Sequence, residues 1–363
     1  MRPEPKSGVL DIAPYVPGRA KAPGVAQPLK LSANENPLGC SEAALAAYRA
    51  AADEIHLYPD ANTSRLRSAL AEKFALEPER LVFGAGSDEI FSMATQAFLR
   101  EGDNAVQPQY GFAAWAIAVR AAGALLKAAP EPDYAPDVDA LLAAIDDRTR
   151  IVFVANPANP TGAWMPFSEI ERLHAAMPAN VLLLLDGAYA ECAHGLDGFG
   201  DGLDWSRDKE NVLVTRTFSK AYGLASLRIG WGYGPAHVVE AFNRIRLPFS
   251  VPRAGEAAAV AALADEAFLE RSVVLFQRGR ARLSEGLIAL GIRVLPSATN
   301  FVTAELDSAA EAQRLDAELA TRGILVRGLA NYGMPRCLRV SVGTDAQIER
   351  VLTAFAEIKI TKS

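Results

Sequence analysis

Cysteine and histidine are scarce in this chain, and their distribution argues against two kinds of protein. The 363 residues contain three cysteines and four histidines. The cysteines, Cys40, Cys192 and Cys337, lie far apart and are odd in number, so we expect buried thiols in a reducing cytoplasm rather than a disulfide framework. The histidines are equally dispersed. Neither set has the spacing of metal ligands, so no metal site is predicted.

The chain also lacks long apolar runs and an excess of basic charge. No apolar run reaches the ~20 residues that a helix needs to cross a bilayer. Residues 1–6 are not followed by the apolar segment of a secretory signal peptide. A net charge of −6 argues against nucleic acid or an anionic membrane as the main partner. We therefore expect a cytoplasmic protein.

What the sequence does contain is the composition of a globular protein with alternating elements. Half of its residues are apolar and 22% are charged, and the length favours two lobes. Several short runs are apolar throughout and end in polar residues or glycine. Such runs are typical of parallel strands covered by helices on both faces. They include residues 151–155, 181–186 and 212–215.

This pattern predicts an α/β fold with a large lobe and a smaller α+β lobe. Residues 1–30 are rich in proline and glycine, so we expect an irregular arm there. The large lobe, residues 46–255, is predicted to hold a mainly parallel sheet sandwiched by helices. Residues 31–45 and 256–363 are predicted to form the small lobe, with one or two long helices over residues 252–290. Capping boxes at residues 168–171 and 344–347 are predicted to open two helices.

Residues 217–228 carry the strongest indication of chemistry. Lys220 follows an apolar strand, the hydroxyl groups of Thr217 and Ser219 precede it, and Arg228 comes eight residues later. A lysine can form a Schiff base with an aldehyde, while hydroxyl groups and a guanidinium fork suit a phosphate. Pyridoxal phosphate needs both. The simpler alternative is a surface lysine at the start of a helix.

Three polar residues are candidates for binding the ring of that cofactor. Asp186 closes the most apolar strand, so we expect it to be half buried and to need a cationic partner such as a protonated pyridine nitrogen. Tyr189 and Asn159 could reach the phenolic oxygen of the ring. The alternatives are a helix cap for Asp186 and a proline-stiffened turn around Asn159.

A glycine turn offers a second place for the phosphate. Gly86, Ser87 and Asp88 lie between an apolar strand and a helix, where free backbone N–H groups bind phosphate and small residues let it approach. Tyr110 could stack on the pyridine face, with an ordinary core tyrosine as the alternative. Tyr58 is expected on a loop.

Seven motifs occur in an order that resembles fold-type I pyridoxal-phosphate aminotransferases, specifically the histidinol-phosphate aminotransferase group. The resemblance extends over nearly the whole chain, from residue 11 to the last helix. The motifs are Asn34-Glu-Asn-Pro37, Tyr58-Pro-Asp60, Gly86-Ser-Asp-Glu89, Asn159-Pro-Thr-Gly162, Asp186-Gly-Ala-Tyr189, Ser219-Lys220 with Arg228, and Leu338-Arg-Val-Ser-Val-Gly-Thr344. Gly187 departs from the family pattern, because an acidic residue is common there.

The resemblance implies a role for each matching residue. Lys220 would hold the cofactor covalently and move a proton between the substrate carbon and the cofactor carbon. Tyr58 would reach the cofactor phosphate of a second subunit, which implies a homodimer with shared active sites. The other cofactor-binding residues would be Gly86, Ser87, Asp88, Tyr110, Asn159, Asp186, Tyr189, Thr217, Ser219 and Arg228.

The resemblance also implies the substrate site and the reaction. Arg339 would bind the substrate α-carboxylate, while Arg327 and Tyr15 would bind the substrate's own phosphate; Asn34 and Asn159 complete the substrate set. The reaction would be transamination between histidinol phosphate and 2-oxoglutarate in histidine biosynthesis. The alternatives are an aromatic amino acid aminotransferase, a phosphothreonine decarboxylase, and a cofactor-binding regulator without catalysis.

Overall fold

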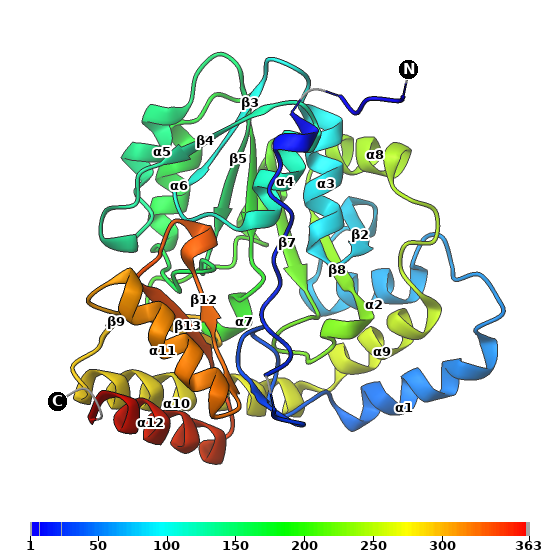
Figure 1. The fold of residues 1–363 in the computed structure, drawn as a ribbon. Helices are drawn as coiled ribbons and strands as arrows, with labels where there is room; N and C mark the ends of the chain where they lie inside the picture. Colours follow the sequence, from blue (N-terminus) through cyan, green and yellow to red (C-terminus); the bar gives the residue numbers. More distant parts are fainter. Residues whose placement is uncertain (1, 7, 23, 361–363) are drawn as a thin grey trace.

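The computed structural model describes residues 2–6, 8–22 and 24–360. Two lobes are visible in Figure 1, and helix α10 (Glu266–Ala289) leads from the large lobe into the small one. The N-terminal segment, in dark blue, runs down the front of the molecule past the small lobe (Figure 1). No helix of the described ranges is long and apolar enough to span a membrane.

A seven-stranded sheet of order β2-β8-β7-β6-β5-β3-β4 forms the centre of the large lobe. Strand β8 runs antiparallel to β2 and β7, whereas the pairs from β7 through β4 are parallel. The strands are β2 (Leu81–Ala85), β3 (Asn104–Pro108), β4 (Leu125–Ala129), β5 (Thr149–Ala155), β6 (Leu182–Asp186), β7 (Val212–Thr217) and β8 (Ile229–Tyr233).

Both faces of this sheet are buried, which explains why its central strands are largely apolar. Successive side chains of a strand point to opposite faces. Val152 and Leu183 therefore lie in one hydrophobic cluster, and their neighbours Phe153 and Leu184 lie in another. Because apolar area buried at both faces is removed from water, apolar side chains predominate in these strands. The buried Arg216 of β7 is balanced by ion pairs with Glu191 and Asp201.

Helices cover the two faces of the sheet in two layers. The first cluster includes side chains from α2 (Ser64–Phe74), α5 (Val138–Ala144), α6 (Phe167–Ala176) and α9 (Arg253–Ala264). The second includes side chains from α3 (Ser87–Phe98), α4 (Ala113–Ala121) and α8 (Ala236–Ile245). Helix α1 (Glu42–Ala50) packs on α9, and the short α7 (Ala190–Ala193) follows β6.

The small lobe is a four-stranded sheet of order β12-β13-β10-β9 with helices on it. All three strand pairs are antiparallel. Leu29–Lys30 (β1) pairs with Ile324–Leu325 (β11), which ties the end of the N-terminal arm to this lobe. The other elements are β9 (Arg293–Leu295), β10 (Phe301–Glu305), α11 (Ala309–Thr321), β12 (Arg327–Gly328), β13 (Cys337–Ser341) and α12 (Asp345–Ile360).

The predicted fold class is confirmed, and one of the two predicted capping boxes is wrong. Thr344 and Gln347 form the reciprocal pair of hydrogen bonds that the motif predicts. Helix α6 instead begins at Phe167 with Pro166 as its N-cap and no side-chain cap, so Ser168 lies inside the helix. The helix therefore starts two residues earlier than the motif indicated, after a proline whose fixed φ is compatible with a helix start.

We propose that the lobe boundary lies between α9 and α10, later than the predicted residue 256. Ala258, Ala262 and Leu263 of α9 belong to the hydrophobic cluster of the large lobe. Phe276, Leu283 and other buried residues of α10 belong to the cluster of the small lobe.

Gly223 sits where the chain behind Lys220 is pressed against an earlier loop. A Cβ atom there would lie 1.9 Å from the carbonyl oxygen of Gly39, and the φ of Gly223 is +72°. Gly102 has a similar φ of +89° but open space around it. Gly102 is therefore a matched control that separates backbone strain from steric overlap.

We expect Gly223→Ala to lower the thermal unfolding midpoint more than Gly102→Ala does. In the Gly102→Ala control the free energy of unfolding should fall by about 1–2 kcal/mol, the cost of an alanine in the left-handed region. In Gly223→Ala it should fall by several times that amount, because the new methyl group also overlaps with backbone atoms. Differential scanning fluorimetry measures the midpoints of both variants. Equal midpoints would contradict the close approach of Gly223 to the carbonyl oxygen of Gly39.

Candidate active site

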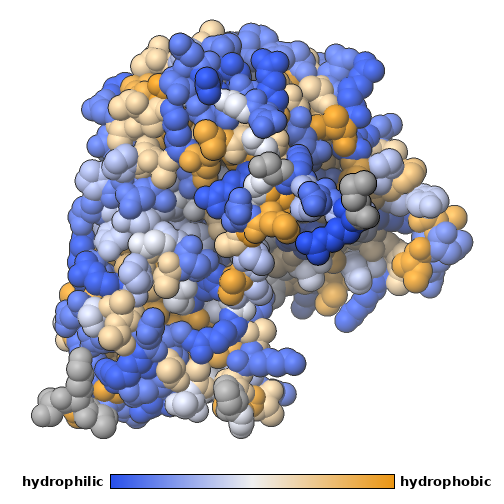
Figure 2. Space-filling model, turned by 45° about the horizontal axis from the view of Figure 1, so that its top comes forward, coloured by the Kyte–Doolittle hydropathy of each residue, from blue (hydrophilic) through white to orange (hydrophobic). Residues whose placement is uncertain are grey.

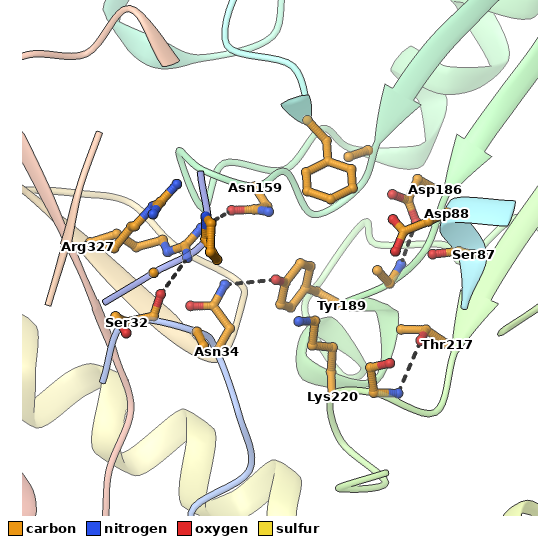
Figure 3. Close-up of a pocket in the computed structure, with 18 of the residues that line it drawn as sticks. Ser32, Asn34, Ser87, Asp88, Asn159, Asp186, Tyr189, Thr217, Lys220 and Arg327 are labelled. Atoms are coloured by element: carbon orange, nitrogen blue, oxygen red, sulfur yellow. Dashed lines mark hydrogen bonds between the residues drawn. The ribbon is translucent and has the colours of Figure 1, made fainter. Parts of the chain in front are cut away.

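A cavity between the lobes gathers most of the residues singled out from the sequence (Figure 3). It opens at the carboxyl ends of β5, β6 and β7, where ligands bind in open α/β sheets. The predicted residues that line it are Tyr15, Asn34, Ser87, Asp88, Asn159, Asp186, Tyr189, Thr217, Ser219, Lys220, Arg228, Arg327 and Arg339.

Lys220 lies on an ordered turn after β7 rather than at the start of a helix. Phe218 is fully buried beside it, and the N–H of Leu224 donates to the carbonyl of Phe218 at 2.9 Å. Burial, together with the positive charge of Arg339, lowers the pKa of Lys220 to about 8, while Asp88 opposes the shift. The neutral, nucleophilic fraction of this amine near physiological pH is therefore far larger than that of a lysine in water.

Asp186 ends β6 with its carboxylate almost fully buried, at 5% exposed. The N–H of Ala188 donates to it at 3.1 Å and the hydroxyl of Thr215 at 3.3 Å. Burial raises the pKa of Asp186 to about 7, and the neighbouring Asp88 raises it as well. Among the described residues Asp186 has no ion-pair partner, so a cationic N–H group in the cavity would stabilise its charged form.

Next to Asp186, the start of α3 faces Arg228 and forms a site suited to an anion. Ser87 and Asp88 begin α3, and Arg228 donates to Asp88 at 3.0 Å and to the Ser219 hydroxyl at 3.1 Å. The N–H of Ser219 donates to the Thr217 hydroxyl oxygen at 3.1 Å. Hydroxyl groups, a guanidinium group and free N–H groups at a helix N-terminus are the usual ligands of a phosphate.

Two glycines allow this close approach. A Cβ atom on Gly86 would lie 2.4 Å from Nη2 of Arg228, and one on Gly230 would lie 2.2 Å from the backbone nitrogen of Ser87. Gly86 does not itself line the cavity; it allows Arg228 to reach the start of α3.

The opposite wall of the cavity carries two arginines from neighbouring strands. Arg327 of β12 pairs with Arg339 of β13 in antiparallel register, so their side chains leave the sheet on one face. Both are buried. Arg339 donates to the side-chain oxygen of Asn159 and, at 3.3 Å, to the carbonyl of Ser32. Its Nε has no partner among the described residues.

Arg327 also fixes the N-terminal arm at the cavity. One of its terminal nitrogens donates to the carbonyl of Val16, and Tyr15, half exposed, lines the cavity beside it. Arg19 pairs with Asp316 of α11. The arm is therefore attached to the small lobe on both sides of residue 18.

A chain of buried hydrogen bonds connects the two walls. Asn34 donates to the hydroxyl oxygen of Tyr189 at 2.8 Å (Figure 3), and its own side-chain oxygen accepts from Ser341 at 3.0 Å. Burial raises the pKa of Tyr189 to about 12, while Arg339 opposes the shift. Tyr189, which follows β6 and precedes α7, therefore stays a protonated hydrogen-bond donor.

Besides Gly86, two residues of the predicted set lie away from the cavity. Tyr110 turns towards Tyr134, with ring centroids 5.2 Å apart, and Phe112 lines the cavity instead. Tyr58 is 78% exposed and stacks on Phe249 at 4.8 Å. The cofactor roles of Tyr58 and Tyr110 stay predictions.

Sequence reasoning missed other cavity residues, notably Ser32, Phe112 and Tyr332. None of them belongs to a motif, and their place in the cavity depends on how the lobes meet. Among the described residues, no group of three or more His, Cys, Asp and Glu side chains could hold a metal ion.

Comparison with known proteins finds a matching family and similar sequences over most of this chain. The family model for aminotransferase class I and II matches residues 26–355. The chain is 48% identical to histidinol-phosphate aminotransferase 1 of Caulobacter vibrioides, covering 97% of this chain and 99% of that protein. It is 44% identical to the histidinol-phosphate aminotransferase of Maricaulis maris, covering 97% and 98%.

A solved structure agrees with these sequence relatives. Histidinol-phosphate aminotransferase from Sinorhizobium meliloti, in complex with pyridoxal-5'-phosphate, superposes with a TM-score of 0.91 at 32% identity. The match covers 98% of each chain. With the family model matching nine-tenths of its length, this chain belongs to the class I and II aminotransferase family.

Proposed function

We propose that this enzyme transfers an amino group from L-histidinol phosphate to 2-oxoglutarate, using pyridoxal phosphate. The observation that carries the proposal is the pair Arg327 and Arg339, two buried guanidinium groups on one face of the cavity, opposite the amine of Lys220. Two cations there suit a doubly charged phosphate. The relatives described above are named histidinol-phosphate aminotransferases, which supports the same substrate here. The reaction would serve histidine biosynthesis.

The cavity fits pyridoxal phosphate on three counts. Lys220 offers an amine whose pKa is lowered to about 8. Asp186 is a buried carboxylate without an ion-pair partner among the described residues. Arg228 and the start of α3 form an anion site that a Cβ atom at Gly86 would obstruct. These three features correspond to the aldehyde, the ring nitrogen and the phosphate of the cofactor.

When bound, the cofactor supplies an electron-withdrawing ring that stabilises negative charge on the substrate carbon. Lys220 would remove the proton from that carbon and return it on the cofactor side. Asp186 would keep the ring nitrogen protonated, and Tyr189 and Asn159 would donate to the phenolic oxygen. The phosphate would be held by Ser87, Asp88, Thr217, Ser219 and Arg228, with Gly86 giving the space.

The substrate residues act by binding and orientation. Arg339 forms a planar fork for an α-carboxylate such as that of 2-oxoglutarate, and Asn159 and Asn34 hold that wall in place through hydrogen bonds. Arg327 and Tyr15 bind the phosphate of the amino donor. The distal carboxylate of the oxoacid takes the same place, since both groups are anions.

We further propose a cytoplasmic homodimer. An exposed apolar surface joins residues 54–58 to residues 247–253, where Arg253 binds the carbonyl of Tyr58 at 2.9 Å and the Glu54 carboxylate at 3.0 Å. Ile55 is 81% exposed and Leu247 67%. Hydrophobic side chains also appear at the right-hand edge of Figure 2, the side on which Figure 1 places α1. A contiguous apolar surface of this kind is typical of an interface.

Amino-donor kinetics test the substrate assignment. The enzyme should use histidinol phosphate with a kcat/KM about 100-fold or more above that for phenylalanine, because phenylalanine leaves Arg327 unpaired in a buried site. Steady-state assays with 2-oxoglutarate measure both values. A large preference for phenylalanine would instead support the aromatic aminotransferase alternative, and carbon dioxide release from phosphothreonine the decarboxylase.

Replacing Lys220 tests the chemistry. Lys220→Ala should abolish both turnover and the visible absorbance of covalently bound cofactor. Lys209, over the ring of Trp205 at 5.5 Å and outside the cavity, is a control whose alanine variant should keep both. Turnover by Lys220→Ala at the wild-type rate would reject the mechanism and leave no catalytic role for this amine.

The dimer surface can be tested with two leucines of matched exposure. Leu247→Asp should produce monomers by light scattering and lose activity, since Tyr58 could no longer reach a second active site. Leu125 lies at the far edge of the sheet, on β4, with 65% exposure. Leu125→Asp should leave the molar mass of the dimer unchanged. A wild-type enzyme with the molar mass of a single chain would contradict the proposed dimer.

A further inference from the structure

We propose that Tyr332 determines specificity for a phosphorylated amino donor by donating a hydrogen bond to the donor's phosphate. This inference rests on the proposed function and deepens it. Tyr332 ends the short 3-10 helix Ala330–Tyr332 between the two arginine strands. It lines the same cavity as Arg327, Arg339 and Tyr15.

The ring of Tyr332 is fixed in place by its surroundings. It is 9% exposed and packs in a small apolar cluster with Leu295, Leu329 and Met334. Its backbone N–H donates to the carbonyl of Leu329 at 2.9 Å, and Gly333 ends the turn with a φ of +77°. A side chain held in this way loses little conformational entropy when it binds a ligand.

The hydroxyl group of Tyr332 is available for a ligand. It has no hydrogen-bond partner within the part of the chain that the structure describes. Burial raises the pKa of this phenol to about 12, while the charges of Arg339 and Arg327 oppose the shift. Tyr332 therefore stays protonated, and both guanidinium groups lie close enough to influence it.

A phosphate needs this third donor and a carboxylate does not. The two oxygens of a carboxylate can both be bound by one guanidinium fork. A phosphate has three terminal oxygens, so the forks of Arg327 and Arg339 leave room for a further donor. Histidinol phosphate carries a phosphate and no carboxylate, whereas 2-oxoglutarate carries two carboxylates. A neutral donor beside two cations therefore favours the amino donor over the oxoacid.

The experiment compares the two substrates of one enzyme. Transamination is a two-stage reaction, so kcat/KM can be measured separately for histidinol phosphate and for 2-oxoglutarate with the holoenzyme. In Tyr332→Phe we expect kcat/KM for histidinol phosphate to fall about tenfold, through KM, as the loss of a hydrogen bond to a charged group predicts. The value for 2-oxoglutarate should change by less than about twofold.

Tyr134→Phe is the matched control. The ring of Tyr134 packs against the same cluster, but its hydroxyl donates to Glu305 at 2.8 Å and does not line the cavity. The ratio of the two kcat/KM values should be unchanged in this variant. As a second readout, inorganic phosphate should inhibit the wild-type enzyme competitively against histidinol phosphate, and about tenfold more weakly in Tyr332→Phe.

Three results would overturn the inference: equal losses for both substrates, no loss for either, or the same change in Tyr134→Phe. Equal losses would give Tyr332 a structural role only. Failure of the proposed function is distinguishable, because the wild-type enzyme would then not turn over histidinol phosphate at all. The visible spectrum of the bound cofactor, which does not involve Tyr332, checks that each variant is folded.

Discussion

Burial of an amine and a carboxylate in one cavity is the constraint on which the rest of this structure depends. Asp186 ends β6 and Lys220 follows β7. These two strands are neighbouring and parallel, and helices cover both of their faces. Removal from water disfavours both charged forms, so the pKa of the lysine falls to about 8 and that of the aspartate rises to about 7. Both groups then titrate close to physiological pH, and a ligand with an aldehyde and a basic ring nitrogen satisfies both.

The small lobe completes the site by bringing anion-binding groups opposite this pair. Arg339 reaches across to Asn159 of the large lobe, and Asn34 reaches Tyr189. Residues assigned to the cofactor and residues assigned to the substrate therefore share hydrogen-bond partners. A change in the substrate wall is expected to be felt at the phenolic oxygen of the cofactor as well as at the substrate.

Much of the fold and part of the site were predictable from local pattern, whereas Arg327, Arg339, Tyr15 and Asn34 were expected only from the family resemblance. Apolar runs without alternation identified the central strands, and polar residues just after them identified Asp186, Asn159 and Lys220. The antiparallel direction of β8 was not predictable. Arg228, just before the strand, has a left-handed conformation with a φ of 55°, and the sequence of β8 does not differ in pattern from its parallel neighbours.

Other features depend on contacts between distant segments. Phe112 lines the cavity and Tyr110 turns away, although only one residue separates them. The backbone N–H of Tyr110 donates to Glu131, and its ring packs near Tyr134. Tyr332 belongs to no motif and enters the cavity only because β12 and β13 place their arginines around it. Sequence spacing does not indicate which of these side chains enters the cavity, because tertiary packing determines their orientation.

The most direct test of the central claim is the pH dependence of cofactor capture by the cofactor-free protein, followed by absorbance. Only the neutral amine of Lys220 attacks an aldehyde, so the rate should rise with pH and level off with a midpoint near 8. A midpoint above 10, the value of a lysine in water, would contradict the account, because the amine would then not be held in a desolvated site.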